Sequence, residues 1–206
     1  MKLYYYTGAC ALADHIVLEW TGATYDLVEM SRESVKSPEY LALNPNGNVP
    51  LLQHGDFLLT ENVAILVYLA ELHPDARLLG DGTPRGRADV LRWLAFLNSD
   101  VHGAFKPIFS PWRFYPDEAG APAVVEAARV RVRDFLERLD AQLDGRDWLV
   151  GERSIADPYL FVMLRWAVGQ KIAIDDLDNL VRFMERMYDD ADVQVAIGAE
   201  EGLAIA

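Results

Sequence analysis

The single cysteine of the chain is the first residue that could do chemistry. Cys10 follows an apolar, aromatic run that ends at Thr7-Gly8, and a helix-type pattern begins just after it. Unpaired backbone N–H groups and the helix dipole at a helix start favour a thiolate, so they lower a thiol pKa that is about 8.5 when free. Because no second cysteine is present, an intramolecular disulfide and a multi-cysteine metal site are excluded. Cys10 is therefore either a buried apolar side chain or a working thiol.

An acid, an amide and a histidine elsewhere in the chain are also placed for chemistry. Glu61 and Asn62 stand at the start of a predicted helix, where backbone N–H groups can receive a carboxylate. Thr60 and Asn62 would also suit simple helix caps. His102 lies beside the apolar Val101 on a long predicted helix. A lone histidine in that setting is more often packed or exposed than catalytic, so the pattern alone leaves its role open.

Short elements of both kinds position the first of these residues. A parallel β-α-β unit precedes a turn-rich stretch, Asn44 to Pro50, which contains two prolines, a glycine and three asparagines. A hairpin and a mostly buried helix follow this stretch. The predicted elements are strands at 2–6 and 24–28, a helix at 11–21 between them, a hairpin within 51–59 and a helix at 61–72.

Linker residues separate this part of the chain from a second part without strand patterns. Glycine and proline recur in the segment from Gly80 to Gly86. Long periodic patterns predict helices at 87–109, 123–143, 155–171 and 177–188. The sequence therefore predicts an α/β N-terminal domain at 1–76, a linker at 77–86 and an all-α C-terminal helical domain at 87–206.

Ser154 and Asp157 have the spacing of a capping box ahead of the apolar run from Tyr159 to Leu164. The Ser154 hydroxyl would accept from the backbone N–H of Asp157, and the carboxylate would accept from the N–H of Ser154. We interpret these residues as structural, because they begin a buried helix and do no chemistry.

The charge balance excludes several classes of partner. The 206 residues include 19 Lys and Arg against 32 Asp and Glu, a net charge of -13, so the field of the protein repels nucleic-acid backbones and anionic membrane surfaces. No apolar run approaches the roughly 18 residues that span a bilayer, and the N-terminus lacks the pattern of a signal peptide. We therefore expect a cytoplasmic protein without nucleic-acid or membrane partners.

Taken together, these motifs resemble the glutathione transferases over the full length of the chain. The features that carry the resemblance are the thiol at the first helix, the Asn-Pro-x-Gly-x-Val-Pro turn, Thr-Glu-Asn ahead of a helix and Ser-x-x-Asp in a helical domain. The residues most similar to the bacterial beta class are Tyr4-Tyr5-Tyr6, Gly8-Ala9-Cys10 and His102. The resemblance implies a thioredoxin-like first domain that binds glutathione as co-substrate, a helical domain that helps bind the acceptor, and a homodimer.

The resemblance also implies which residues form the site. Cys10 and His102 would serve the reacting thiol. The glutathione-binding residues would be Cys10, Lys36, Asn48, Val49, Pro50, Glu61, Asn62 and His102, with a cis bond between Val49 and Pro50. Two positions depart from the class. Ala11 stands where a serine is common, and Gly103 stands where a lysine is usual, although Lys106 lies one turn further on.

Glutathione carries two carboxylates, an ammonium and a thiol, so its site needs both donors and acceptors. Glu61 can face the ammonium, while the start of its helix, together with the Asn62 side chain, receives the γ-glutamyl carboxylate. The backbone of Val49 can pair with the cysteinyl part of glutathione as an added strand would. Lys2, Arg32 and Lys36 are candidates for the glycyl carboxylate, although each also suits a solvated surface position.

Aromatic residues provide a candidate acceptor pocket, because an electrophile site needs apolar walls beside a polar thiol. Its members are Tyr5, Phe105, Phe109, Trp112 and Trp166. The same helical spacing would suit a packed core equally well. The pattern does not separate pocket from core.

We interpret the chain as a glutathione transferase that conjugates the glutathione thiol to small hydrophobic electrophiles, as in detoxification. Cys10 and His102 would stabilise the thiolate of the ligand, and the hydroxyl of Tyr5 or Tyr6 is a further option, because other classes of the family use a tyrosine near this position. A nucleophilic Cys10 would instead form a mixed disulfide and support thiol-disulfide exchange. The alternative function is a non-catalytic module that binds glutathione or hydrophobic ligands on the same fold, which Ala11 and Gly103 would favour.

Overall fold

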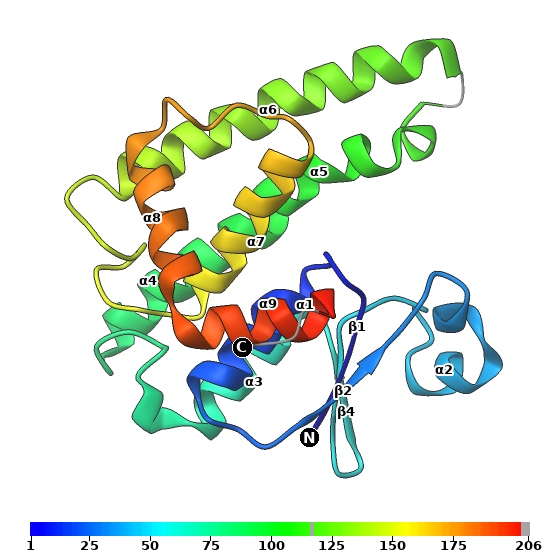
Figure 1. Cartoon of the computed structure of the whole chain (residues 1–206), viewed down its shortest axis with the longest axis vertical. Helices are drawn as coiled ribbons and strands as arrows, with labels where there is room; N and C mark the ends of the chain where they lie inside the picture. Colours follow the sequence, from blue (N-terminus) through cyan, green and yellow to red (C-terminus); the bar gives the residue numbers. More distant parts are fainter. Residues whose placement is uncertain (116–117, 203–206) are drawn as a thin grey trace. The chain divides into compact units, whose positions relative to one another are not determined.

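The computed structural model describes residues 1–115 and 118–202, and contacts divide them into two units. The first unit contains residues 1–79 and the described residues from Met187 onwards. The second unit contains the described residues between Gly80 and Arg186. Figure 1 shows an α/β unit and a helical one, which confirms the predicted fold class. The boundary between Leu79 and Gly80 falls inside the segment predicted as a linker.

A four-stranded sheet with the order β2-β1-β3-β4 forms the centre of the first unit. β1 pairs in parallel with β2 and antiparallel with β3, and β3 pairs antiparallel with β4. The parallel pair needs a crossover, which α1 supplies. The strands are β1 (Lys2–Tyr5), β2 (Asp26–Glu29), β3 (Leu51–His54) and β4 (Phe57–Thr60). The helical segments are α1 (Ala11–Trp20), η1 (Ser34–Lys36), α2 (Pro38–Leu43), α3 (Asn62–Leu72) and η2 (Pro74–Ala76).

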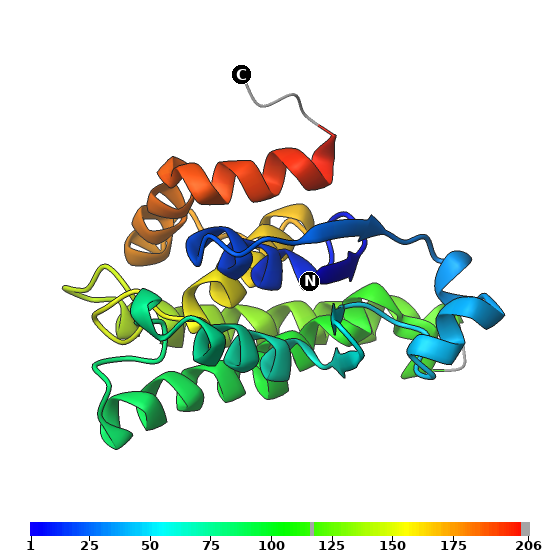
Figure 2. The same cartoon turned by 90° about the horizontal axis from the view of Figure 1, so that it is seen from below.

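The last helix, α9 (Ala191–Glu201), packs against α1 in the first unit, and Figures 1 and 2 both show the two helices side by side. The Thr7 hydroxyl donates to the Glu200 carbonyl at 2.7 Å, and Nδ1 of His15 lies 3.2 Å from the Glu200 carboxylate. Almost every residue of α1 is buried, so this helix needs cover on the side away from the sheet. The expected helical domain ran to residue 206, whereas the described residues after Arg186 group with the α/β unit.

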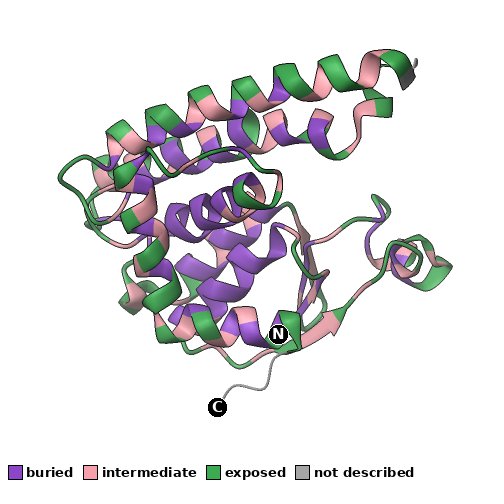
Figure 3. Cartoon of the chain, turned by 45° about the horizontal axis from the view of Figure 1, so that its top comes forward, coloured by how far each residue is buried: buried purple, intermediate pink, exposed green. Residues whose placement is uncertain are grey.

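The described part of the second unit is helical and contains no strand. Its segments are α4 (Pro84–Phe96), a π-helical segment (Leu97–Val101), α5 (His102–Phe109), η4 (Pro111–Arg113), η5 (Glu118–Gly120), α6 (Ala121–Gln142), α7 (Ala156–Gly169) and the first part of α8 (Asp178–Asp189). Buried and exposed residues alternate along α6, whereas α7 is buried over most of its length (Figure 3). The single helix predicted for 87–109 is therefore two α-helices with a π-helical segment between them.

The predicted capping box at the start of α7 is half correct. The Asp157 carboxylate accepts from the backbone N–H of Ser154 at 2.7 Å, as expected, and also from that of Leu149 at 3.0 Å. The Ser154 hydroxyl, however, donates to the same carboxylate at 2.9 Å and accepts from the N–H of Ala156. Burial raises the pKa of Asp157 to about 6, against the hydrogen bonds that lower it.

Candidate functional site

The register of the sheet brings three loops to one end of the first unit. Tyr4 lies opposite Leu51, and Leu51 lies opposite Thr60. The chain that leaves β1, the chain that enters β3 and the chain that leaves β4 therefore meet at the same edge. These segments carry Cys10, the Val49–Pro50 bond and Glu61, so the fold brings together these predicted glutathione-binding residues, whereas His102 belongs to the second unit.

Cys10 stands directly before the first residue of α1 and is 9% exposed. Burial raises the pKa of its thiol to about 12, and the nearby Asp14 raises it further. A hydrogen bond from its own backbone N–H lowers the pKa by less than these two effects raise it. The expectation that the helix start favours a thiolate is therefore wrong for this structure, because desolvation and a buried acid outweigh the helix terminus. Cys10 is a neutral thiol at pH 7.

Asn62, the first residue of α3, is turned into the protein. Its amide nitrogen donates to the Cys10 carbonyl at 2.8 Å and to the Asp14 carboxylate at 3.2 Å, and all three residues are buried. Burial raises the pKa of Asp14 well above its usual range. One oxygen of Asp14 and the amide oxygen of Asn62 have no hydrogen-bond partner among the described residues. The Asn62 side chain therefore holds the Cys10 loop, so the prediction that this side chain receives the γ-glutamyl carboxylate is wrong for this structure. The backbone N–H of Asn62 remains for a ligand.

Glu61 precedes α3 with a φ of 73°, a left-handed conformation that is unusual for a residue with a side chain. Such strain is often found at functional sites. The Glu61 side chain is exposed and makes no capping hydrogen bond to the helix. The first backbone N–H groups of α3 are thus not capped by this side chain, which is the arrangement that binds anions at helix starts.

The turn between α2 and β3 is fixed by hydrogen bonds from two directions. The Tyr40 hydroxyl and the Asn44 amide donate to the Asn48 carbonyl at 2.7 and 2.8 Å. The Lys36 ammonium donates to the Gly47 carbonyl at 2.7 Å and is otherwise exposed. The Val49–Pro50 bond is cis, as the resemblance implied. The turn therefore presents a rigid backbone with a cation beside it.

In the second unit, His102 begins α5 and contacts α7. Its Nδ1 lies 2.7 Å from the hydroxyl of Tyr159, and this hydroxyl donates to the side-chain oxygen of Asn98 at 3.0 Å. Burial lowers the pKa of His102 to about 4, and the nearby Lys106 lowers it further. The imidazole is consequently neutral at pH 7, so it can accept a proton but carries no charge.

Three of the predicted acceptor-pocket residues form one aromatic cluster with His102. The Trp166 ring stands nearly perpendicular to those of His102, Phe105 and Phe109, with centroids 4.9, 5.5 and 5.1 Å apart. Phe105 is fully buried, whereas Phe109 is 39% exposed. The cluster is therefore core at one end and open at the other.

The two remaining predicted pocket residues lie outside this cluster. Trp112 is 66% exposed and makes no ring contact with the clustered side chains. Tyr5 belongs to the first unit and is buried in β1, which raises the pKa of its hydroxyl. Their role in acceptor binding stays a prediction.

Sequence reasoning missed Tyr159 and Asn98. Tyr159 was assigned to the apolar core of the helix that begins at Ala156, and it is indeed fully buried. A buried tyrosine hydroxyl nearly always needs a hydrogen-bond partner, which was the one signal in the sequence that pointed to a polar contact at this position. Nothing in the sequence shows that the partners are 57 and 61 residues away.

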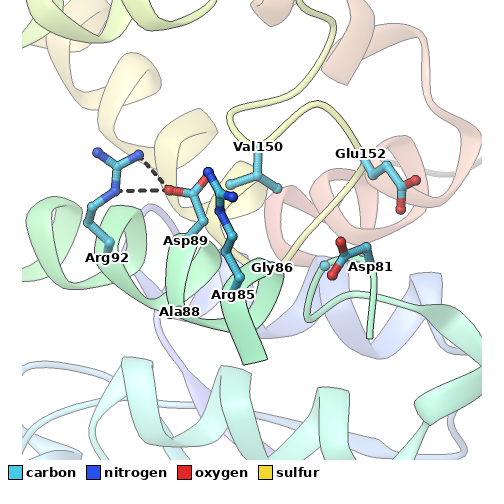
Figure 4. Close-up of a pocket in the computed structure, with 9 residues that line it drawn as sticks. Asp81, Arg85, Gly86, Ala88, Asp89, Arg92, Val150 and Glu152 are labelled. Atoms are coloured by element: carbon cyan, nitrogen blue, oxygen red, sulfur yellow. Dashed lines mark hydrogen bonds and ion pairs between the residues drawn. The ribbon is translucent and has the colours of Figure 1, made fainter. Parts of the chain in front are cut away.

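A separate depression in the second unit is lined by charged side chains from the start of α4 and from the segment before α7 (Figure 4). Arg92 donates to Asp89 at 3.0 Å, and Asp81 accepts from the backbone and hydroxyl of Thr83 at 2.9 and 2.6 Å. Because these groups already satisfy one another, we assign no ligand to this depression.

Comparisons with known proteins agree with this geometry. Models of the N-terminal and C-terminal domains of glutathione S-transferases match residues 1–71 and 101–190. A glutathione S-transferase of Xanthomonas campestris is 47% identical over 97% of this chain and 98% of that protein. A solved glutathione S-transferase from Xylella fastidiosa is 46% identical, with a TM-score of 0.94 over 98% of both chains. A bacterial beta-class glutathione S-transferase from Sphingomonas chungbukensis is 37% identical, with a TM-score of 0.85 over 97% of this chain and 98% of that chain.

These similarities confirm the resemblance to the bacterial beta class and do not favour the alternative of a non-catalytic module. None of the helices in the described part of the chain is long and apolar enough to cross a membrane.

Proposed function

The chain belongs to the glutathione S-transferase family, and we propose that it conjugates the thiol of glutathione to small hydrophobic electrophiles. The observation that carries the proposal is the convergence of Cys10, the cis Val49–Pro50 turn and the start of α3 at one edge of the sheet. This edge offers separate groups for each polar part of glutathione.

The binding scheme follows from the charges at that edge. The start of α3 receives the γ-glutamyl carboxylate through its backbone N–H groups, including that of Asn62, and Glu61 faces the ammonium. The backbone of Val49, held next to the anchored carbonyl of Asn48 and ahead of Pro50, pairs with the cysteinyl part of the ligand. Lys36 supplies the charge for the glycyl carboxylate.

The thiol that reacts in this proposal belongs to glutathione. A buried Cys10 with a pKa of about 12 is a poor nucleophile, but its neutral S–H group can donate a hydrogen bond to the thiolate of the ligand. His102 accepts the proton that the glutathione thiol loses. The sulfur of glutathione then forms a bond to the electrophilic carbon, and the leaving group departs with its electron pair.

The aromatic cluster provides the apolar wall of the acceptor site. Phe109 and Trp166 present ring surface beside His102, with Phe105 packed behind them. We include Tyr5 and Trp112 as further members, the first next to the thiol loop in the chain and the second just after α5. Apolar walls beside a polar group are what a hydrophobic electrophile needs.

We also propose a homodimer in the cytoplasm. On the first unit, Phe57 is 46% exposed and its ring contacts that of Tyr68 at 5.4 Å. On the second unit, exposed arginines cover aromatic rings: Arg131 over Phe135, Arg138 over Phe96 and Arg92 over Trp93. Arginine and aromatic residues are enriched at protein interfaces. A free cysteine and a glutathione substrate both fit a reducing compartment.

The test of the enzyme is Cys10→Ala compared with the wild type in two assays, conjugation of a chloronitroaromatic acceptor and reduction of a glutathione mixed disulfide. We expect the variant to keep conjugation within about tenfold of the wild type, because only one weak donor is lost. If the wild type reduces the mixed disulfide and the variant does not, Cys10 is instead the reacting thiol. A wild-type protein that neither conjugates nor binds immobilised glutathione would refute the proposal.

The dimer has its own test, which is the molar mass in solution by light scattering. We expect the mass of two chains for the wild type and a shift toward one chain for Arg138→Glu. A wild-type mass of one chain at the concentrations of the activity assay would contradict the dimer and leave the activity proposal unaffected.

A further inference from the structure

Two linked hydrogen bonds join the side chain of Asn98, the hydroxyl of Tyr159 and a ring nitrogen of His102. Nδ1 of His102 lies 2.7 Å from the Tyr159 hydroxyl, and the hydroxyl oxygen lies 3.0 Å from the side-chain oxygen of Asn98. Tyr159 is fully buried, so its hydroxyl is directed by these partners rather than by bulk water. The His102 and Tyr159 rings lie almost perpendicular, at 80°, with centroids 6.0 Å apart.

The side chain of Asn98 determines which atoms donate in these two hydrogen bonds. The side-chain oxygen of Asn98 can only accept, so the hydrogen of the Tyr159 hydroxyl points to it. The hydroxyl oxygen then offers its lone pairs to His102, and Nδ1 must carry the hydrogen that fills the 2.7 Å contact. A neutral imidazole has one N–H group, so Nε2 is left with a lone pair.

We propose that Asn98 and Tyr159 are positioning residues that hold His102 in the Nδ1–H tautomer, so that Nε2 accepts the thiol proton of glutathione. This inference rests on the proposed function for the identity of the thiol. In the step, the S–H bond of glutathione breaks, its electron pair stays on sulfur and the proton forms the new Nε2–H bond. The resulting imidazolium returns the proton to solvent or to the leaving group after the carbon–sulfur bond has formed.

Asn98 and His102 lie where the helix is irregular. The π-helical segment Leu97–Val101 contains Asn98 and ends directly before His102. Both side chains contact the same Tyr159 hydroxyl because residues four apart along a helix lie on the same face. Single π-helical turns inside α-helices are rare and frequently mark functional sites. The spacing of Asn98 and His102 therefore directs two side chains of one helix to one buried group of another.

The state of His102 agrees with the proposal. Burial lowers the pKa of this imidazole to about 4, so the neutral tautomer is the species present at pH 7. Among the described residues Nε2 has no hydrogen-bond partner, in contrast to Nδ1. The thiolate that forms beside the ring stabilises the imidazolium, because an opposite charge favours the charged form.

A second histidine in the chain makes a similar contact without the third member. Nδ1 of His54 lies 2.9 Å from the hydroxyl of Tyr68, and this pair is exposed. Solvent can therefore satisfy either tautomer of His54. The pair provides a matched control for the effect of removing one tyrosine hydroxyl from one histidine.

The test reads the tautomer directly by nitrogen NMR of the full-length protein labelled at histidine nitrogen, at pH 7 and without glutathione. Protonated and unprotonated ring nitrogens differ strongly in chemical shift. We expect His102 of the wild type to show a protonated Nδ1 and an unprotonated Nε2. Tyr159→Phe is expected to move the population toward the Nε2–H form, whereas Tyr68→Phe changes the signals of His54 and leaves those of His102 unchanged.

Asn98 provides a second variant that does not alter the buried ring. Asn98→Leu removes the acceptor and is expected to shift the tautomer as Tyr159→Phe does, whereas Asn98→Asp keeps an acceptor and retains the wild-type signals. An unprotonated Nδ1 in the wild type would overturn the proposal, because Asn98 would then present its amide nitrogen to the hydroxyl. A wild-type tautomer that persists in both Tyr159→Phe and Asn98→Leu would overturn it as well.

Kinetics separate positioning from a structural role. Tyr159→Phe is expected to lower kcat/KM about tenfold by lowering kcat, with little change in the KM for glutathione. In the His102→Ala background the same substitution is expected to have no further effect, because Tyr159 acts through His102. Additive losses would overturn the proposal. A wild-type protein with the expected tautomer but no transferase activity would refute the proposed function while the assignment of the His102 tautomer stands.

Discussion

Cys10 at the start of α1 is buried and His102 at the start of α5 is half-buried, and burial has opposite effects on their pKa values. It raises the pKa of the thiol to about 12 and lowers the pKa of the imidazole to about 4. Both groups are therefore neutral at pH 7, because desolvation disfavours the charged form whatever its sign. Cys10 keeps a hydrogen to donate and His102 keeps a lone pair to accept. Neither group is therefore itself an activated nucleophile.

The largest expected effect concerns the reactivity of Cys10. At pH 7 we expect alkylation of the folded protein by iodoacetamide to be roughly 1,000-fold slower than that of the unfolded chain, because the thiolate fraction falls with the raised pKa. The measurement is the labelling rate by mass spectrometry, with urea-unfolded protein as the reference. Asp14→Asn should speed labelling, since it removes the second cause of the shift. Labelling as fast as in the unfolded chain would show that burial does not raise the pKa of the Cys10 thiol, and the contrast with His102 would then fail.

Removal of the imidazole should reduce activity more than removal of the thiol. We expect His102→Gln to lower kcat/KM about 100-fold, the lower end of the contribution of a positioned general base, and Cys10→Ala to lower it about tenfold or less. The measurement is steady-state conjugation of a chloronitroaromatic acceptor at saturating glutathione. The reverse order of the two losses would show that the thiol, and not the imidazole, carries the chemistry.

The Cys10 loop should depend on Asn62 for its stability. Asn62→Ala leaves the buried Cys10 carbonyl and the Asp14 carboxyl without this donor, so we expect the free energy of unfolding to fall by about 2 kcal/mol. Urea unfolding measures the change. The control is Asn46→Ala, which replaces an exposed asparagine and should change stability by less than about 0.5 kcal/mol. Equal effects of the two substitutions would mean that the buried amide does not hold the loop.

The last prediction is a pH dependence that His102 adds to stability. Its pKa is about 4 in the folded protein, below the ordinary value of 6.5 that applies when the chain is unfolded. Between pH 6.5 and 4, His102 is therefore protonated in the unfolded state and mostly unprotonated in the folded state. The free energy of unfolding of the wild type falls over this range as the pH drops. His102→Gln lacks this loss, so its stability relative to the wild type should improve toward pH 4, and a constant difference would contradict a neutral His102.

Much of the fold was predictable because it follows local patterns. The positions of glycine and proline, together with apolar periodicity, predicted the β-α-β unit, the hairpin and the helix that follows it. The structure contains all of them. The Asp157 carboxylate accepts from Ser154 as expected, because both partners lie within one turn of helix. The hydroxyl of Ser154 takes another role, since the buried carboxylate attracts its hydrogen. The interruption at Leu97–Val101 gave no comparable signal.

The sequence by itself determined where the thiol lies relative to a helix and which segments carry the polar groups of the site. It did not determine the protonation of Cys10, because the burial that raises the pKa of this thiol most exists only in the folded protein. It did not assign Tyr159, whose hydroxyl joins His102 across 57 positions. Helix starts act through neighbouring peptide groups, which a sequence shows. Desolvation and hydrogen-bond partners act through residues that only the tertiary structure brings together, and here they decide the state of both groups.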